Sequence, residues 1–249
     1  MNNKGLNAII RIASVLIFFS IWQVFSFILE VDLLPGPKDV ILKIIEETEN
    51  NELYIHTAIT LKRVLLSFLI AMLVGTFFGI YMGRNPNLNT FLDDWLILGL
   101  NVPALVIIIL CYVWFGLNEV AAILAVSLNK IPMVTVIMRE GYRSIEKDYL
   151  DVGKFYNIPQ KKIFLKIILP QLFPFLLSAA RSGLSLIWKI VLVVELLGRS
   201  NGVGFKLFGF FQFFDISGIL AYTFVFVLVI IFVEFLIVRP FEKRISAWR

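Results

Sequence analysis

Six long apolar stretches constrain this sequence more than any other feature. Each spans 19 to 25 residues, and about 20 apolar residues in a helix cross a bilayer core of about 30 Å. Hydrophobic residues make up 59% of the chain and charged residues only 16%, unlike a soluble domain. We therefore expect an all-α membrane protein with six transmembrane helices, at Leu6–Leu29, Val64–Met82, Leu96–Phe115, Val120–Met138, Phe173–Leu197 and Ile216–Val238.

Lysine and arginine are distributed unevenly between the two sides of this arrangement. Both termini with the connections 83–95 and 139–172 hold 13 basic residues, whereas 30–63, 116–119 and 198–215 hold 6. Because basic residues concentrate on the cytoplasmic side, we predict a multi-pass protein with both termini in the cytoplasm. The net charge of +5 is then a topology signal, and we expect the lipid bilayer rather than nucleic acid as its partner.

A short amphipathic segment follows the first span. Pro37 suits the first position of a helix, and residues 38–49 place their apolar side chains on one face. We expect a helix on the outer surface, which either lies at the membrane interface or docks an external partner. The chain then divides into an N-terminal span with this external segment, 1–63, and a five-helix core, 64–249.

The connection 139–172 is the longest predicted cytoplasmic segment. Its seven basic and four acidic residues alternate with apolar ones at helical spacing. We expect two short helices broken near Asn157, because asparagine tolerates a left-handed backbone better than most residues. Pro159 suits the first turn of the second helix, and Pro170 is expected to end that helix before the next span.

This segment resembles the EAA motif of permeases in ATP-binding-cassette (ABC) importers. That motif is Glu-Ala-Ala, three residues, Gly, nine residues, Ile-x-Leu-Pro, and the spacing here matches throughout. The end, Ile167-Ile168-Leu169-Pro170, matches in identity, but Asp151-Val152-Gly153 replaces Glu-Ala-Ala and Asn157 replaces the glycine. Nearly the whole chain is similar to permeases of the nitrate, sulfonate and taurine group, for example at Leu34-Pro35-Gly36-Pro37, Ala180-Arg181, Trp188, Glu195 and Gly202-Val203-Gly204.

The resemblance implies a type I ABC importer permease fold in the bacterial inner membrane. It implies a cytoplasmic loop that docks as a coupling helix on an ATPase, with Asp151 pairing with a basic residue there. The coupling residues that it implies are Tyr149, Asp151, Val152, Gly153, Asn157, Leu169 and Pro170. The implied partners are two cytoplasmic ATPase subunits that carry ATP and Mg, an external solute-binding protein, and a second permease subunit that forms a homodimer. The residues agree on one point, because no internal repeat supplies a second half of a path.

Charged residues inside the spans are candidates for a translocation path, since such residues usually face the bundle interior or a wet cavity. Arg181, Trp188 and Glu195 are spaced by seven on one helix, and Lys189 lies close to that stripe. Lys130 lies in the middle of the preceding span. The excess of positive charge favours an anionic or zwitterionic solute, although similar permeases carry neutral ones. Alternatively, Lys189 pairs with Glu195, or Lys130 with a carbonyl, only to bury charge.

Covalent chemistry is not expected of this chain. It has no Gly-x-x-x-x-Gly-Lys-Ser/Thr loop to hold phosphates, so ATP hydrolysis is expected on a separate polypeptide. With one cysteine, Cys111, and one histidine, His56, we predict neither a metal site nor a catalytic residue. Two other readings stay open, an ion-coupled secondary transporter or channel that needs no ATPase, and an integral-membrane enzyme acting on lipids.

Overall fold

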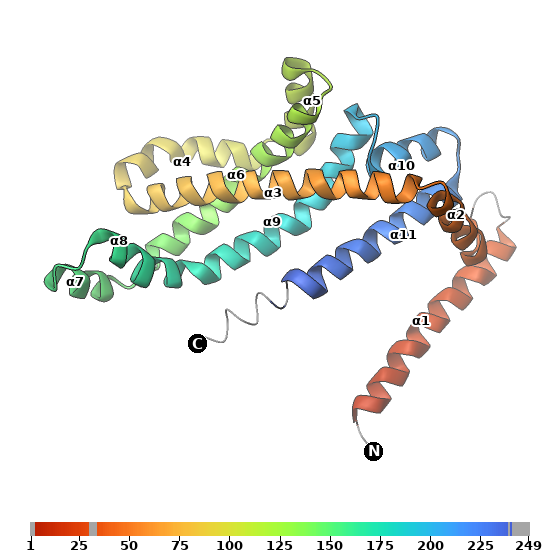
Figure 1. Cartoon of the computed structure of the whole chain (residues 1–249), viewed down its shortest axis with the longest axis horizontal. Coiled ribbons are helices and arrows are strands. Elements are labelled where there is room, and N and C mark those ends of the chain that lie inside the picture. The colour runs from red at the N-terminus through yellow and green to blue at the C-terminus, as the bar shows by residue number, and fades with distance from the viewer. Residues whose placement is uncertain (1–2, 30–33, 239, 241–249) are drawn as a thin grey trace.

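Three long helices form the centre of the protein (Figure 1). The computed structural model describes residues 3–29, 34–238 and 240, and within these ranges it has helices and no strand. The central helices are α3 (Glu52–Arg84), α6 (Glu119–Arg143) and α9 (Leu169–Gly198). The all-α class is confirmed for the described residues.

Helix α3 approaches α6 closely because glycines recur on its contact face. A Cβ added at Gly75 or Gly79 would lie 2.6 Å from the Cβ of Val134 or of Met138, respectively. Gly83 repeats the spacing of four, since a Cβ there would lie 2.7 Å from that of Tyr142. Small residues at this spacing let two membrane helices pack backbone to backbone, and they position the two central helices.

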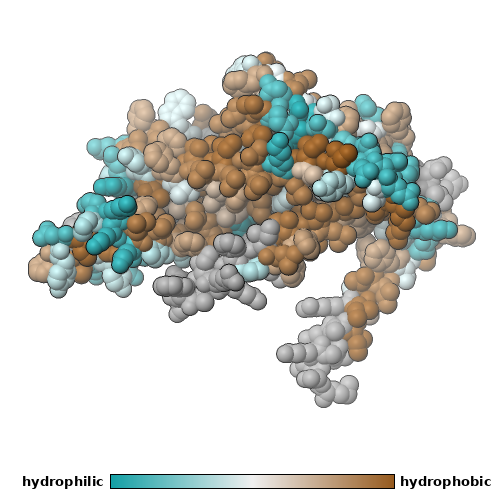
Figure 2. Space-filling view, viewed as in Figure 1, coloured by the Kyte–Doolittle hydropathy of each residue, from teal (hydrophilic) through white to brown (hydrophobic). Residues whose placement is uncertain are grey.

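Four of the predicted spans are confirmed as helices long and apolar enough to cross a membrane. They run over Glu52–Arg84, Glu119–Arg143, Gln160–Gly198 and Ile216–Leu236. The fourth comprises α11 (Ile216–Val233) and part of the π-helical η2 (Glu234–Val238). Figure 2 shows hydrophobic residues over the middle of the molecule and hydrophilic residues gathered toward the two ends of its long axis. That distribution suits a bilayer around the middle.

The third predicted span, Leu96–Phe115, is wrong as a single straight helix. Helix α4 (Pro86–Asn101) and helix α5 (Ala104–Phe115) meet at an angle of 98°. Val102 breaks the helix because the residue before a proline, here Pro103, avoids the helical conformation, and its ψ is 123°. The predicted loop 83–95 is largely helical as well, since Asn85 caps α4 by accepting the N–H groups of two residues.

The second predicted helix of the cytoplasmic segment does not end at Pro170, which is a correction. Helix α8 (Gln160–Ile163), the π-helical η1 (Phe164–Ile168) and α9 follow one another without a break. In η1 the N–H of Leu169 reaches the carbonyl of Phe164. Pro170, which has no N–H, falls directly after this π-helical turn, where the regular hydrogen-bond pattern is already interrupted.

The first helix of the chain reaches the core near its end, where the Trp22 ring stacks on that of Phe224 with the centroids 5.5 Å apart. Helix α1 (Asn3–Ile28) diverges from the bundle in Figure 1, and the Trp22 indole donates to the carbonyl of Pro35 at 3.1 Å. The apolar part of α1 within the described residues, Ile12–Ile28, is shorter than the four spans. A count of six spans therefore stays a prediction.

The remaining helices lie at the two ends of the long axis. Helix α2 (Pro37–Glu49) begins at proline as predicted, and it lies at one end with α10 (Val203–Gln212). Helix α7 (Lys147–Phe155) and α8 lie at the opposite end. The predicted division at residues 63 and 64 stays a prediction, and it falls inside the continuous helix α3.

Candidate functional site

The predicted coupling segment is a compact pair of short helices. Asn157 separates α7 from α8 with a φ of 50°, so the left-handed break predicted there is confirmed. Gly153 is buried, and a Cβ there would lie 3.1 Å from Cδ1 of Ile163 on α8. The Ile158 N–H donates to the Gly153 carbonyl at 2.9 Å and closes the turn. The coupling role of Gly153 and Asn157 stays a prediction, but both residues shape this pair.

One face of α7 is apolar and exposed. Tyr149 and Val152 are exposed, and Phe155 and Tyr156 leave 82% and 71% of their surface uncovered. Asp151 is exposed beside them. Aromatic side chains around a charged group are typical of protein interfaces, so this face has the composition of a docking surface. Leu169 and Pro170 lie farther along, at the start of α9.

The five predicted path residues do not form one stripe. Trp188 and Glu195 are on the buried side of α9, and Trp188 meets Phe226 edge to face at 5.7 Å. Arg181 and Lys189 are exposed, and Arg181 lies 3.5 Å from Glu234 on η2. Their path role stays a prediction.

Lys130, on α6, differs from all four of these residues. It is buried, with 7% of its surface exposed, and it has no hydrogen-bond or ion-pair partner among the described residues. Neither of the two alternative pairings, Lys130 with a carbonyl or Lys189 with Glu195, occurs among the described residues.

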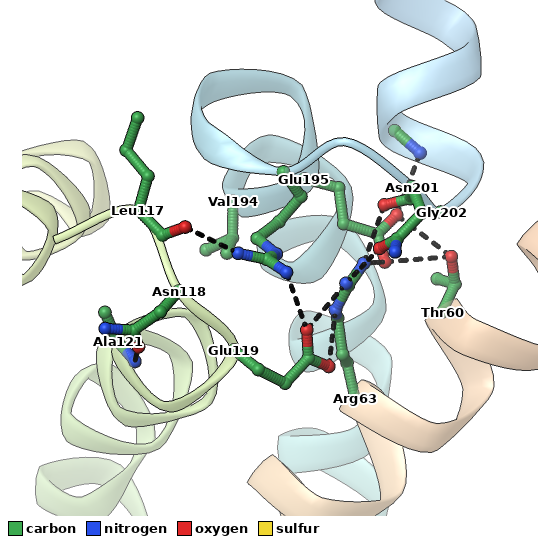
Figure 3. A network of polar contacts seen from close by, with 12 residues as sticks. Thr60, Arg63, Leu117, Asn118, Glu119, Ala121, Val194, Glu195, Asn201 and Gly202 are labelled. Carbon is green, nitrogen blue, oxygen red and sulfur yellow. Dashed lines mark hydrogen bonds and ion pairs between the residues drawn. The ribbon is translucent and has the colours of Figure 1, made fainter.

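Arg63 is the partner of Glu195, and it links the ends of the central helices that lie away from α7 and α8, which we call the outer ends after the predicted topology (Figure 3). Its Nη1 donates to Glu195 Oε1 at 2.8 Å. Its Nε and Nη2 donate to the two carboxylate oxygens of Glu119, at 2.9 and 2.8 Å. The two-pronged geometry is the strongest that an arginine makes with a carboxylate. Because these residues belong to α3, α9 and α6, one guanidinium joins all three helices.

The segment after α9 closes over Glu195. The carboxylate accepts from the Thr60 hydroxyl and from the Gly204 N–H, each at 2.9 Å. Gly202 has a φ of +108°, and a Cβ there would lie 2.3 Å from the Glu195 carboxyl carbon. Only glycine fits this position, so the string Gly202-Val203-Gly204 serves to wrap the buried carboxylate.

The rest of this outer network, defined as Thr60, Arg63, Glu119, Glu195, Arg199 and residues 201–204, is nearly complete in its pairing. Arg63 Nη1 donates to the Asn201 carbonyl at 2.8 Å, and its Nη2 donates to the Asn201 side-chain oxygen. Arg199 donates to the Leu117 carbonyl at 2.7 Å and lies 3.2 Å from Glu119. Two guanidinium groups thus face two carboxylates, and buried charges persist when they are paired in this way.

His56 holds the same segment from α3. Its Nδ1 accepts from the Gly202 N–H at 2.8 Å, and its Nε2 lies 2.9 Å from Glu52. These partners favour the neutral ring with the proton on Nε2. Both ring nitrogens of His56 thus take part in holding this segment, which is a structural role.

A second polar cluster ties α2 to α10 and α11. The Tyr222 hydroxyl donates to Glu47 at 2.8 Å, and Lys206 lies 3.1 Å from the same carboxylate. Burial acts to lower the pKa of Lys43, but its hydrogen bond to Glu46 and the carboxylates of Asp215 and Glu47 raise that pKa on balance. No group of His, Cys, Asp and Glu suited to a metal ion occurs in the part of the chain that the structure describes.

Sequence reasoning missed Arg63, Thr60 and Glu119. A signal existed, because a buried acid such as Glu195 requires a nearby donor, and Arg63 lies at the outer end of a span. Lys130 and Lys189 were further candidates in the sequence for the partner of Glu195, and only the packing of the helices identifies Arg63 as that partner.

A family model, curated relatives and solved structures all match this chain. Residues 63–247 match the family described as binding-protein-dependent transport system inner membrane component. The putative aliphatic sulfonates transport permease protein SsuC of Bacillus subtilis is 28% identical, over 94% of this chain and 85% of that protein. The taurine transport system permease protein TauC of Escherichia coli is 27% identical, over 86% of this chain and 80% of that protein.

Two further matches extend the comparison. The bicarbonate transport system permease protein CmpB of Synechococcus elongatus is 27% identical, over 82% of this chain and 77% of that protein. A structure of the MetNI methionine ABC transporter matches with a TM-score of 0.64 at 15% identity, over 76% of this chain and 92% of the matched one. At that identity the structure supports the fold alone.

Proposed function

We propose, from the premise that this chain belongs to the family of binding-protein-dependent transport system inner membrane components, that it forms the translocation path of an ABC importer for a small oxyanion. It is a permease subunit, since residues 63–247 match the family and relatives over most of its length are ABC importer permeases. It is a transport subunit rather than an enzyme. The solute and the route through the chain are our proposals.

A polar stripe on the exposed face of α9 carries the proposal for the route. Lys189 and Arg181 lie on this face together with small hydroxyl side chains, and the spacing repeats at three or four residues. The stripe extends over about 16 Å of the helix. Its members, which we call the α9 polar stripe, are Ser178, Arg181, Ser182, Ser185 and Lys189. Such a stripe is costly against lipid, so it lines a wet path or a second copy of the chain.

The charges of the stripe favour an anion. It contains two cations and three hydroxyls, and α9 has no acidic residue before Glu195. Glu234 offsets part of the charge of Arg181 at 3.5 Å, which leaves Lys189 as the stronger attraction. The named relatives handle sulfonates, taurine and bicarbonate, and each of these carries an anionic oxygen group. Trp188 and Glu195 act on the path by positioning α9.

The exposed face of α7 supports the proposed coupling. Phe155, Tyr156, Val152 and Asp151 offer apolar surface beside a carboxylate, which suits a groove on an ATPase subunit better than water. The rest of the assembly follows the family: two such ATPases, a second copy of this permease and an external solute-binding protein. In this arrangement the protein lies in the inner membrane of a bacterial cell, with the coupling segment and both termini in the cytoplasm.

Reconstitution tests the proposal. The permease, its ATPase and its binding protein are placed in proteoliposomes, and uptake of taurine, ethanesulfonate and bicarbonate is measured. We expect accumulation of at least one of these anions that requires ATP and the ATPase and that survives a protonophore. Uptake by the permease alone, abolished by the protonophore, would identify an ion-coupled transporter instead.

A further inference from the structure

Lys130 is an exception among the buried charges of the described residues. Arg63, Glu195 and Glu47 are also buried, and each has a charged partner within 3.1 Å. Lys130 is equally buried and has none. An unpaired buried ammonium is costly inside a membrane, so its persistence in the middle of α6 calls for a ligand from outside the chain.

The Lys130 nitrogen is not sealed off. In the described part of the chain, the fully buried side-chain atoms without a partner are the hydroxyls of Thr57 and Thr76 and Nε of Arg199. Nζ of Lys130 also lacks a partner but is not among them, so it retains contact with the molecular surface. The nitrogen is therefore accessible to a molecule of solvent size.

Gly183, on α9, is an exception of a second kind. Elsewhere in the bundle a buried glycine allows close contact, as Gly79 does against Met138 and Gly141 against Phe175, where an added Cβ would lie 2.6 Å away. Gly183 is buried too, yet an added Cβ would meet no atom within 4 Å. This glycine leaves a space instead of a contact.

The register of α6 and α9 brings the two exceptions together. The helices are antiparallel, and two contacts fix their alignment: Gly141 against Phe175 at one end, and Glu119 with Arg199 at 3.2 Å at the other. Counting 11 residues from either contact places Lys130 level with residues 186–188. Gly183 is then three to five residues away, or about 5–8 Å along the axis.

We propose that Lys130 and the space at Gly183 form an intramembrane binding site for a small oxyanion, such as a sulfonate or carbonate group. The ammonium supplies the counter-charge, and the space admits the anionic head. In α6 no acid lies between Glu119 and Glu140, so nothing on that helix competes for the lysine. The site rests on the proposed function for its occupant, since an anion in the path is what would fill it.

The first experiment measures the charge at this site without any transport. Leu186 is partly exposed, lies level with Lys130, and neighbours Gly183 on α9 because residues three apart share a helix face. The sole cysteine, Cys111, is replaced by alanine. The full-length Leu186→Cys permease in nanodiscs is then modified with an anionic and with a cationic methanethiosulfonate reagent. The ratio of the two rates reports the local potential.

The expected result is a loss of anion preference when the ammonium is removed. Lys130→Met should lower the ratio of anionic to cationic rates about fivefold or more, while Lys130→Arg retains it. Lys62→Met, at an exposed lysine on α3, is the matched control and leaves the ratio unchanged. Lys130→Met should melt at a temperature at least as high as the parent, because it removes an unpaired buried charge. An unchanged ratio in Lys130→Met would overturn the proposal.

The second experiment tests the space. Ethanesulfonate should slow modification of the Leu186→Cys permease, and this protection should disappear in Lys130→Met and in Gly183→Val. Gly209→Val is the matched control, because Gly209 on α10 also has nothing within 4 Å of an added Cβ. Protection that persists in a folded Gly183→Val would place the anion elsewhere. The labelling experiments need no ATP. They can therefore contradict the site at Lys130 while ATP-driven uptake supports the proposed function, or support the site while uptake contradicts that function.

Discussion

The two ends of the molecule differ in which side chains they bury and which they expose. At the outer end, Arg63 is 1% exposed and Glu195 is fully buried, and they join helices that are far apart in sequence. At the other end, α7 and α8 contact each other through Gly153 and Ile163 and expose their aromatic residues. Buried charged pairs resist separation, whereas exposed apolar side chains gain by meeting a partner. Stability is therefore concentrated at the outer end, and the end with α7 and α8, which we call the inner end, carries the surface of the proposed docking.

The largest expected effect of a single change is that of Arg63→Met. It leaves Glu195 buried and without its charged partner, a loss that typically costs about 3–5 kcal/mol. The thermal unfolding midpoint of the detergent-purified permease should fall steeply. Arg143→Met is the control at the inner end, because Arg143 is exposed and its pair with Glu140 is worth less than about 1 kcal/mol. Equal midpoints for the two variants would contradict the contrast.

Gly202→Ala should have the next largest effect. The added methyl would lie 2.3 Å from the Glu195 carboxyl carbon, at a φ of +108°, and strain of this kind costs about 1–3 kcal/mol. The same thermal measurement applies. Gly209→Ala, where the space is open, should unfold like the parent. A Gly202→Ala permease as stable as Gly209→Ala would show that the segment over Glu195 is loosely held.

A smaller, local effect is expected from Asn157→Ala. Alanine at a φ of 50° costs about 1–2 kcal/mol, but Asn157 is exposed, so the strain is confined to the turn between α7 and α8. Backbone amides of residues 150–163 should exchange hydrogen faster, with little change in the global unfolding midpoint. Asn157→Gly should leave exchange unchanged. Faster exchange in α3 or α9 as well would mean that the inner end is not an independent unit.

The smallest effect on stability, with a large effect on assembly, is expected from Phe155→Ser. Phe155 is 82% exposed, so its loss should change the free energy of unfolding by less than about 0.5 kcal/mol. The fraction of permease that copurifies with the ATPase should drop, and Asp151→Lys should have the same result. Phe213→Ser, at an equally exposed residue between α10 and α11, should bind the ATPase normally. Normal binding by Phe155→Ser would remove α7 from the interface.

The sequence predicts elements better than it predicts partners. The spans at Val64–Met82, Val120–Met138 and Phe173–Leu197 follow from hydropathy, and the break at Asn157 follows from its tolerance of a left-handed backbone. Val102-Pro103 signals a kink between α4 and α5, but the sharpness of the bend was not predicted, because a hydropathy window averages across the break. The pairing of Glu195 with Arg63 depends on how α3 and α9 align in space, which the pattern of neither helix contains.

The uninterrupted run from Gln160 to Gly198 has a mechanical consequence. Its 39 residues amount to a length of about 58 Å, with the α7–α8 pair at one extremity and the pocket around Glu195 at the other. A tilt of about 10° about one extremity would displace the other by about 10 Å. We expect this long helix to bend first at the π-helical turn Phe164–Ile168, because the hydrogen bonding there departs from the regular pattern. The stiffness of that turn determines how much of a displacement at the α7–α8 end is transmitted to the end at Glu195.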